Sequence, residues 1–344
     1  MISLPRAVRI FGTGRFASDL CRGLESRGTE IVGFVQTTPS APSFMGKPIV
    51  AASSAAAGDD TPLFVGIYNY TPSADYAALA TALAASFRNV VFPMTFYPAL
   101  ASELGPRYWL DQKPGTDALK VSKLLADDQS KALLQQIVKF RQGDPMAMKG
   151  TLSPGSQYFI PEVLAALPKQ VRWVDAGAYD GDTLVESVKQ FKTASVTAFE
   201  PDPANLVKLR KNIATLGLPV WVLPLGVSDR SGMVSFEAGQ EGASSTVFGG
   251  GTMTIALATL DDVLPTQNID FLKIDVEGAD LDVVNGARKI IERSQPVIAM
   301  AAYHAPEHLH QVPELLHQVL PKHRILLRSH ASNTFDTICY ALPA

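Results

Sequence analysis

The sequence predicts an α/β protein in which two parallel-sheet domains follow each other along the chain. Three observations lead to this prediction. Short apolar runs alternate with amphipathic segments, a glycine turn follows the first apolar run of each series, and a turn-rich stretch separates the two series. Repeated strand–helix units are typical of doubly wound, mostly parallel sheets. With 344 residues, the chain is long enough for each domain to bury its own core. We place the domains at 1–104 and 161–344, with a helical connector at 105–160.

The composition argues against several classes of protein. The chain has a net charge of −3 and no long basic run, so it lacks the electrostatic signature of nucleic-acid binding. Its two cysteines, Cys21 and Cys339, lie far apart and form no ligand cluster or disulfide framework. The N-terminus lacks the apolar core of a signal peptide, and no apolar run reaches the ~20 residues that span a bilayer. We expect a cytoplasmic protein that binds neither nucleic acid nor membrane, and the sequence is compatible with a homo-oligomer.

The N-terminal domain is expected to be a Rossmann-like half-unit that ends near Leu104. Apolar runs predict strands at 7–11, 31–35, 63–67 and 89–92. Amphipathic or alanine-rich segments predict helices from about 15 to 27 and from 73 to 88. The stretch after the second strand is expected to be a loop, because it carries Pro39, Pro42, Gly46 and Pro48.

The turn after the first strand, GTGRFA, fits a known fingerprint. Gly12, Gly14 and Ala17 match the G-x-G-x-x-G/A pattern of dinucleotide sites, between a strand and a helix. Such a site needs an acidic residue at the end of the second strand, and Gln36 stands there instead. We therefore favour glycines that serve a tight turn and close helix packing. A nucleotide site in this domain is the alternative.

The connector is expected to be helical. Asp127 or Asp128 would cap a helix that carries apolar residues up to Phe140, and Gly143-Asp144-Pro145 would end it. A loop with two adjacent aromatic residues, Tyr158 and Phe159, leads into the C-terminal domain. We expect these two side chains to pack against the domain, with a lid over a ligand as the alternative.

From Val171 onward, strands and helices alternate strictly. The expected strands are 171–175, 195–199, 220–225, 269–274, 296–301, 323–328 and 336–341, with a meander around 233–236. The expected helices are 182–190, 203–215, 279–292 and 306–319. The last two strands, joined by a short polar loop, predict an antiparallel hairpin at the edge of the sheet. Ligands of such sheets bind at the carboxyl ends of the strands, where the motifs AGAYDGD, FEPD, LGVSD, DVEG and AYHAPE fall.

The glycine turn AGAYDGDT is acidic and carries no lysine or arginine. Asp175, Asp180 and Asp182 disfavour a pyrophosphate there and favour a ligand with positive charge. Glu200 ends the next strand, 23 residues after Gly177, where an acidic side chain can accept both ribose hydroxyls of a nucleoside. A nucleoside without phosphates but with cationic groups describes S-adenosylmethionine. The alternative is an acidic, solvated rim around a structural turn.

The motifs of the C-terminal half resemble those of a known family. VDAGAYDGDT, FEPDPANLVKLRKN, GVSDRSGMVSF, TLDDVL and IDFLKIDVEGADLDVVNGA resemble, in order, the motifs of FkbM-type methyltransferases, from about residue 153 to the end of the chain. The resemblance implies the class I S-adenosylmethionine-dependent methyltransferase fold, with seven strands and the last one antiparallel. It also implies methyl transfer to oxygen on a sugar, glycan or secondary metabolite. The upstream half resembles the nucleotide-binding-like domain that some of these proteins carry.

We assign cofactor binding to the glycine turn and to the end of the next strand. The assigned residues are Asp175, Gly177, Ala178, Tyr179, Gly181, Asp182, Thr183, Glu200 and Pro201, with Asp229 at the adenine edge. For Asp229 the alternative is a turn-forming role in SDRSG. In the resembled family, a serine pair near Ser244, Ser245 and Thr246 contacts cofactor or substrate, and a flexible loop is the alternative here.

The acceptor side needs a residue that takes the proton of the attacking oxygen. The candidates are Lys273, Asp275 and Glu277 in KIDVEG and His304 in AYHAPEH. The alternative is that Asp275 or Glu277 caps the next helix and Lys273 pairs with it. All six histidines lie between His304 and His330, but Pro306 makes a regular helix through His304 and His308 unfavourable. We therefore predict no metal site.

Together these observations predict an S-adenosylmethionine-dependent O-methyltransferase that acts on a small molecule or glycan. Two other functions stay open. The GTGRFA turn could serve an NAD(P)-dependent oxidoreductase, although Gln36 argues against it. The sheet could also hold a nucleoside or sugar as a non-catalytic scaffold.

Overall fold

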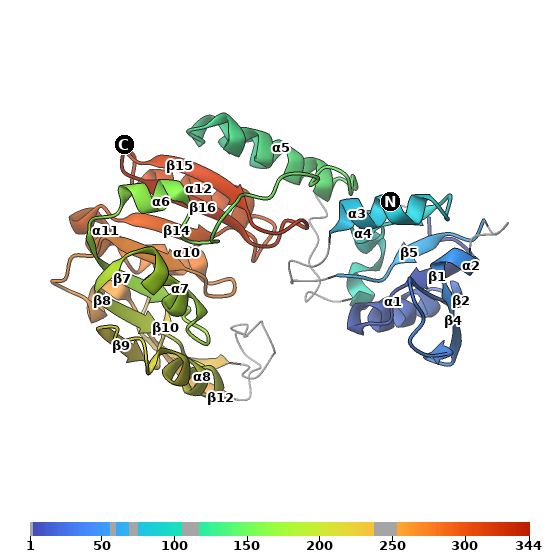
Figure 1. Ribbon diagram of the computed structural model, residues 1–344, viewed down its shortest axis with the longest axis horizontal. Helices are drawn as coiled ribbons and strands as arrows, with labels where there is room; N and C mark the ends of the chain where they lie inside the picture. The colour runs from blue at the N-terminus through green and yellow to red at the C-terminus, as the bar shows by residue number, and fades with distance from the viewer. Residues whose placement is uncertain (1–2, 56–59, 69–74, 105–116, 237–252) are drawn as a thin grey trace. The chain divides into compact units, whose positions relative to one another are not determined.

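The computed structural model describes residues 3–55, 60–68, 75–104, 117–236 and 253–344 (Figure 1). The chain forms two compact units. The first contains Met1–Leu119, Ala132–Leu152 and Ala331–Phe335, and the second contains Lys120–Lys131, Ser153–His330 and Asp336–Ala344. The segment expected as a connector is divided between them. Within the described ranges, no helix has both the length and the apolar character needed to cross a membrane.

The N-terminal unit is built on a six-stranded sheet in the order β3-β4-β2-β1-β5-β6. All neighbouring strands pair in parallel except β3 and β4. The strands are β1 (Ala7–Phe11), β2 (Glu30–Gln36), β3 (Ser43–Phe44), β4 (Lys47–Ala51), β5 (Leu63–Val65) and β6 (Val90–Val91). The helices are α1 (Arg15–Ser26), α2 (Ala52–Ala55), α3 (Tyr76–Ala84) and α4 (Pro93–Leu104). Phe16, Phe64 and Phe96 stack in its core. The predicted Rossmann-like α/β organisation is confirmed.

The prediction of a loop after β2 is wrong in part, because this segment contains the short hairpin β3–β4. Pro48 did not exclude a strand there, since β4 begins its parallel pairing with β2 only at Ile49. The missing N–H of Pro48 is therefore not needed in that ladder.

The C-terminal unit is built on a seven-stranded sheet in the order β15-β16-β14-β13-β7-β8-β9. The strands are β7 (Gln170–Ala176), β8 (Lys192–Phe199), β9 (Val220–Leu223), β13 (Phe271–Ile274), β14 (Val297–Ala301), β15 (Arg324–Ser329) and β16 (Thr337–Leu342). β16 pairs antiparallel with both of its neighbours, and the other pairs are parallel. The predicted seven strands and antiparallel hairpin are confirmed, but the last strand lies inside the sheet, between β14 and β15.

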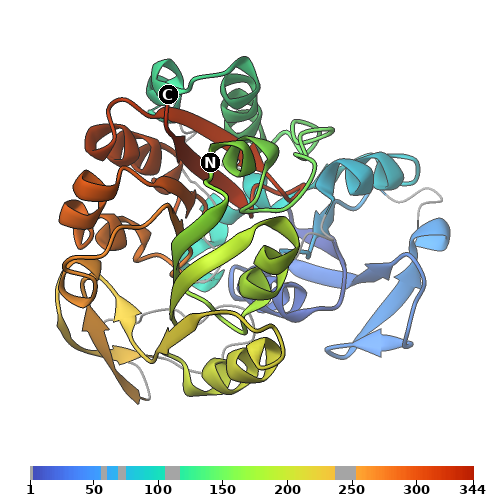
Figure 2. The same cartoon turned by 60° about the vertical axis from the view of Figure 1, so that its left-hand side comes forward.

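Helices cover both faces of this sheet. Figure 2 shows α7 and α8, in green and yellow, on one side and the orange-to-red helices α10, α11 and α12 on the other. The unit's helices are η2 (Ala118–Leu124), α6 (Pro161–Ala166), α7 (Asp182–Gln190), α8 (Pro203–Ile213), α9 (Leu260–Val263), α10 (Asp280–Asn285), α11 (Arg288–Ser294) and α12 (His308–Val319), and α5 (Asp128–Arg141) starts in it. A small sheet of β10 (Gly226–Val227), β12 (Met253–Ala258) and β11 (Gly232–Phe236) completes it. Trp173, Phe199 and Phe271 are fully buried in the core.

The single helix expected at 279–292 is wrong: the structure has two short helices, α10 and α11. Gly286 lies between them, and a Cβ on it would come within 2.0 Å of the carbonyl oxygen of Ser228. The carboxylate of Asp261 accepts hydrogen bonds from the backbone N–H groups of Lys289 and Ile290 and so caps α11. The apolar residues of this segment recur with helical period throughout. The close approach of Gly286 to Ser228 and the cap from Asp261 nevertheless divide it into two helices.

The parallel strands bring their carboxyl ends to one edge of the sheet. β7 leads into Gly177, β8 into Glu200, β13 into Asp275 and β14 into His304. β16 runs the other way, and Ile338 pairs with Ala301 at the end of β14, so Asp336 also comes to this edge. This edge is where the fold class places ligands.

Candidate active site

The turn after β7 is hydrogen-bonded to the end of β8 and packs against the backbone carbonyl of Asp275. The backbone N–H groups of Gly177 and Ala178 both donate to the carbonyl of Phe199, at 3.1 and 2.9 Å. Gly177 has φ +86°, and a Cβ on it would lie 1.8 Å from the carbonyl oxygen of Asp275. Only glycine fits at a left-handed position that touches another backbone so closely. The strand-to-turn junction is therefore defined by close packing of two neighbouring strand ends.

The turn then leads directly into helix α7. Gly181 is the N-cap of α7 and has φ +86°. Asp182 is exposed, Thr183 is buried, and both belong to the first turn of the helix. Negative charge in this position is favourable because the helix dipole is positive at its N-terminus. The acidic turn predicted from the sequence is thus present, with Asp182 on its outer side.

Two non-glycine residues in the turns after β7 and β13 have left-handed backbones. Tyr179 has φ 47° in the turn after β7, and Glu277 has φ 56° in the turn after β13. Such conformations cost energy in residues other than glycine, asparagine or aspartate, and they concentrate at functional sites. They mark both strand-end turns as candidates for ligand contact.

Glu200 is buried at the end of β8 and faces the glycine turn. Its Oε2 accepts the backbone N–H of Tyr179 at 2.9 Å, and its Oε1 accepts that of Asp202 at 2.9 Å. Burial raises the pKa of Glu200 to about 6, against the hydrogen bonds from Asp202, Asn205 and Tyr179, which lower it. Oε2 receives this one hydrogen bond among the described residues, so a lone pair is left to accept a hydroxyl.

Lys273 and Asp175 form a buried ion pair between the neighbouring strands β13 and β7. Their Nζ and Oδ1 atoms are 3.0 Å apart, and the side chains are 4% and 0% exposed. Lys273 also donates to the carbonyl of Gly177, and its Nζ lies 5.2 Å from the ring centre of Tyr158. Burial raises the pKa of Asp175 to about 6, although Lys273 lowers it. Lys273 thus supports the glycine turn from behind.

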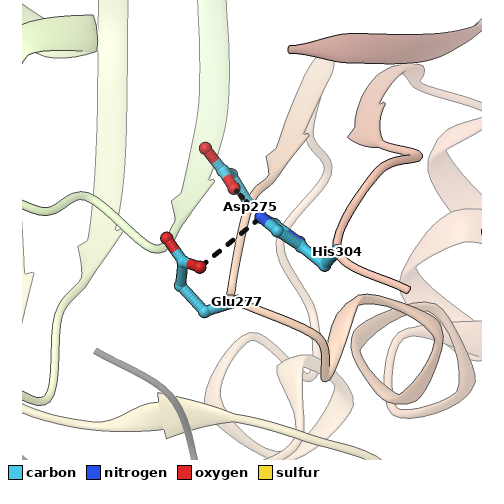
Figure 3. Close-up of side chains that lie close together, drawn as sticks. All are labelled: Asp275, Glu277 and His304. Carbon is cyan, nitrogen blue, oxygen red and sulfur yellow. Dashed lines mark ion pairs between the residues drawn. The ribbon is translucent and has the colours of Figure 1, made fainter. Parts of the chain in front are cut away.

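Asp275, Glu277 and His304 come together at the ends of β13 and β14, and we call these three residues the cluster. Figure 3 shows their side chains pointing toward a common centre. His304 Nε2 lies 3.1 Å from Asp275 Oδ1 and 3.7 Å from Glu277 Oε2. One ligand atom from each side chain lies within 4.8 Å of the others. The structure therefore unites three of the four residues predicted for the acceptor side.

Asp280 determines the state of the His304 ring. Its fully buried carboxylate accepts the backbone N–H groups of Val276 and Gly278, at 3.0 and 3.1 Å, so it acts as an acceptor. His304 Nδ1 lies 2.7 Å from Asp280 Oδ2 and must be the donor in that hydrogen bond. Nε2 is then the atom that faces the cluster. Burial alone would lower the pKa of His304, but Asp280, Asp275 and Glu277 raise it well above its usual range.

The two carboxylates of the cluster have opposite pKa shifts. Burial alone would raise the pKa of Asp275, but His304, Lys273 and the hydroxyl of Tyr158 lower it. Tyr158 donates to Asp275 Oδ2 at 2.5 Å. No such donor is found for Glu277 among the described residues, and burial raises its pKa to about 7. Groups whose environments push their pKa values apart are typical of acid–base sites.

Four residues of this region were not assigned to the site from the sequence. Asp280 positions His304, Tyr158 contacts Asp275, and the ring of Tyr303 lies 4.4 Å from that of His304. Asp336 lies close enough for the charge of Asp275 to act on it, and burial raises its pKa to about 6. Asp280 lies at the start of the predicted helix 279–292, where an acidic residue is typical of a helix cap and does not indicate a site. The position of Asp336 depends on β16, which no local pattern reveals.

The remaining predicted residues lie around this centre. Asp275 and Glu277 do not cap α10, whose N-cap is Ala279. Asp229 is exposed in the turn after β10 and accepts a hydrogen bond from Ser228. Pro201 lies between Glu200 and α8, and Asp202 caps that helix. Phe159 packs against Trp173, Phe191 and Phe271, so the packing interpretation is confirmed for it. Ser244, Ser245 and Thr246 lie outside the described residues.

The GTGRFA turn of the N-terminal unit has a structural explanation. A Cβ on Gly66, at the end of β5, would meet Ile10, Ala17 and the carbonyl of Phe11 within 3 Å, so β1, β5 and α1 pack closely there. Gln36, at the position where a dinucleotide site has an acidic residue, donates to the hydroxyl of Thr13 at 2.9 Å. These contacts fit the interpretation of this turn as architecture.

Comparisons with known proteins agree with the fold. Residues 175–324 match the family model described as the methyltransferase FkbM domain. The hexuronic acid methyltransferase AglP of Haloferax volcanii is 34% identical over 112 residues, 30% of this chain and 46% of that protein. The match thus spans about half the length of that curated relative. The crystal structure of methyltransferase FkbM from Methylobacillus flagellatus KT has a TM-score of 0.75 and 22% identity, over 98% of this chain and 90% of the other. It shares the fold of both units.

Proposed function

We propose that the chain, whose residues 175–324 match the methyltransferase FkbM domain, transfers the methyl group of S-adenosylmethionine to a hydroxyl oxygen of a sugar. The observation that supports this most is a juxtaposition at one sheet edge. A buried acidic residue, Glu200, faces the glycine turn after β7, and a cluster with unpartnered basic atoms lies two strands away along the same edge.

The residues present fit S-adenosylmethionine. The turn from Ala176 to Thr183 holds no lysine or arginine, so it offers no cationic side chain to a pyrophosphate. Lys273, which lies behind the turn, is already paired with Asp175, and Lys208 lies over the ring of Tyr179. Glu200 keeps a lone pair for a ribose hydroxyl, and the exposed carboxylate of Asp182 suits a ligand with positive charge. We assign Asp175, Gly177, Ala178, Tyr179, Gly181, Thr183 and Pro201 to the frame of this site.

When bound, S-adenosylmethionine supplies a methyl group on a sulfonium, which is already activated for displacement. The protein then has to orient an acceptor oxygen and remove its proton. The cluster of Asp275, Glu277 and His304 is the place where the described residues can do so. Nε2 of His304 and Oδ1 of Asp275 are buried and have no hydrogen-bond partner among the described residues. We propose that the acceptor hydroxyl binds at the cluster and loses its proton there.

A sugar that carries a carboxylate is the first acceptor class to test, because a relative is named a hexuronic acid methyltransferase. Such a sugar offers two kinds of oxygen. The cluster is suited to taking a proton from an acceptor. A carboxylate acceptor has no proton to give up at neutral pH, whereas a hydroxyl has one. We therefore propose that a hydroxyl accepts the methyl group and that the product is an ether.

This proposal is tested by incubating the protein with methyl-labelled S-adenosylmethionine and a panel of hexuronic acid and neutral sugar acceptors. Label transferred to a sugar hydroxyl survives mild alkali, because an ether is stable to base. Release of the label by alkali identifies a methyl ester and contradicts a hydroxyl acceptor. A panel without any incorporation, together with tight binding of S-adenosylhomocysteine, favours the scaffold function.

Replacing Glu200 with glutamine is expected to weaken binding of S-adenosylhomocysteine by about 10- to 100-fold, since hydrogen bonds to a charged group contribute about 1.5–3 kcal/mol. Below pH about 6 the wild-type carboxylate takes up a proton. The affinity of the wild-type protein for S-adenosylhomocysteine should therefore fall as the pH decreases through that value. The Glu200→Gln variant should lack this pH dependence. Calorimetric titration between pH 5 and 8 measures both.

Glu186→Gln is the matched control, because Glu186 lies half-buried on α7 rather than at the end of β8. It should leave the affinity and its pH dependence unchanged. If the Glu200→Gln variant binds S-adenosylhomocysteine as tightly as wild type at pH 7.5, the assignment of Glu200 to the cofactor site is wrong.

A further inference from the structure

When the His304 ring is neutral, the cluster brings three electron-pair donors to one point. Because His304 Nδ1 donates to Asp280, a neutral ring has its lone pair on Nε2, toward the cluster. Asp275 Oδ2 already accepts from Tyr158, so Oδ1 is the oxygen that faces this lone pair. Glu277 Oε2 approaches from the other side. Three acceptors that face one another repel unless a positive charge lies at their centre.

A proton on Nε2 of His304 would make a poorly aligned hydrogen bond to the carboxylates of the cluster. Nε2 and Asp275 Oδ1 are 3.1 Å apart, within ion-pair distance, yet both atoms are buried without a hydrogen-bond partner of acceptable geometry among the described residues. The side chain of His304 is only 5% exposed, so water does not complete the contact freely. Nε2 of His304 is thus a buried atom without a hydrogen-bond partner among the described residues, and it faces a pair of carboxylates.

The spacing agrees with a metal ion instead. Nitrogen and oxygen ligands lie about 2.0–2.2 Å from a first-row divalent metal, which puts neighbouring ligands about 3.0–3.6 Å from each other. The observed ligand separations are 3.1 and 3.7 Å from His304 Nε2, and all three atoms lie within 4.8 Å of one another. Small side-chain movements would bring the three atoms into contact with one ion.

We propose that Asp275, Glu277 and His304 bind a divalent metal ion, with Asp275 Oδ1, Glu277 Oε2 and His304 Nε2 as its protein ligands. One imidazole and two carboxylates suit ions that accept both nitrogen and oxygen, such as Mn²⁺. Asp280 holds the imidazole in the tautomer that a metal needs, and Tyr158 holds the carboxylate of Asp275. A hydrogen-bonded outer shell of this kind is typical of metal sites.

This ion deepens the proposed function and, in its catalytic consequence, rests on it. Three protein ligands leave coordination positions open for an acceptor oxygen. An ion held by these three residues would make a nearby hydroxyl more acidic, and the hydroxyl would then lose its proton to solvent water rather than to Nε2 or Oδ1. The O–CH₃ bond then forms as the S–CH₃ bond of the cofactor breaks, and S-adenosylhomocysteine leaves as a neutral thioether. Metal binding itself does not depend on this step.

The test is a calorimetric titration of the full chain with MnCl₂ after dialysis against a chelator and then against chelator-free buffer. Loss of the six-line Mn²⁺ signal in electron paramagnetic resonance measures the bound ion independently. We expect one saturable site per chain. His304→Ala and Glu277→Gln should each weaken Mn²⁺ binding at least about 10-fold, as loss of a ligand does. Glu277 is 35% exposed, so its isosteric replacement keeps the fold.

His310→Ala is the matched control, because His310 lies on α12, outside the cluster. It should bind Mn²⁺ as wild type does, and thermal unfolding of each variant verifies that it is folded. The proposal is overturned if wild type shows no saturable Mn²⁺ binding up to millimolar concentration, or if both cluster variants bind as wild type. A chain that binds Mn²⁺ but transfers no methyl group would contradict the proposed function and leave the metal site intact.

Discussion

Gly177→Ala is expected to remove cofactor binding and to destabilise the C-terminal unit by more than about 4 kcal/mol, the range reached only when backbone or core geometry is broken. The new Cβ would lie 1.8 Å from the carbonyl oxygen of Asp275 and 2.8 Å from its carbonyl carbon. Neither atom is the end of a flexible side chain, so β7 and β13 would have to separate. Urea denaturation followed by tryptophan fluorescence measures this loss, because Trp173 is buried in the core of this unit.

Gly217→Ala separates the steric clash from backbone strain. Gly217 also has a left-handed backbone, with φ +63°, but a Cβ there meets nothing within 4 Å. It should cost only the about 1–2 kcal/mol of placing alanine in that conformation. If the two variants were equally stable and both bound S-adenosylhomocysteine, the close approach of the turn to Asp275 would not define the site.

Lys273→Met is expected to destabilise the same unit by about 3–5 kcal/mol, the usual result of removing one partner of a buried ion pair. Asp175 is 0% exposed and would be left without its counter-ion. The carbonyl of Gly177 would also lose its donor, so the glycine turn should loosen. We therefore expect a lower midpoint in urea together with weaker binding of S-adenosylhomocysteine.

Lys131→Met is a control with the same substitution. Lys131 and Asp128 form an i,i+3 pair whose side chains are 39% and 101% exposed. Exposed pairs of this kind contribute about 0–1 kcal/mol. Adding Asp175→Asn to Lys273→Met should recover part of the lost stability, because no buried charge then lacks a partner. Equal effects of Lys273→Met and Lys131→Met would contradict a structural role for the buried pair.

The order of strands and helices around the site could be predicted from the sequence because it depends on local patterns. The runs at 171–175 and 195–199, followed by Gly177 and Glu200, have strand period and turn residues within a few positions. Parallel pairing then places both ends at one edge. The helix predicted at 182–190 has the same bounds as α7, because Gly181 is its N-cap and Phe191 is its C-cap.

What the sequence did not reveal depends on contacts between distant segments. The insertion of β16 between β14 and β15 is a long-range pairing, and it alone brings Asp336 to the site. The break at Gly286 comes from the carbonyl of Ser228. The role of Asp280 depends on His304, which lies 24 residues away. From the sequence, Asp275, Glu277 and His304 were separate candidates. Their convergence is a property of the folded strand ends.

The most direct test of the account is calorimetric titration of the purified chain with S-adenosylhomocysteine, with NAD⁺ and NADP⁺ titrated in parallel. We predict one site for S-adenosylhomocysteine in the ~1–100 μM range that is common for enzyme ligands, and no binding of either dinucleotide. Binding of a dinucleotide with none of S-adenosylhomocysteine would contradict the account. It would move the function to the GTGRFA turn, and the turn at Gly177 would then be architecture.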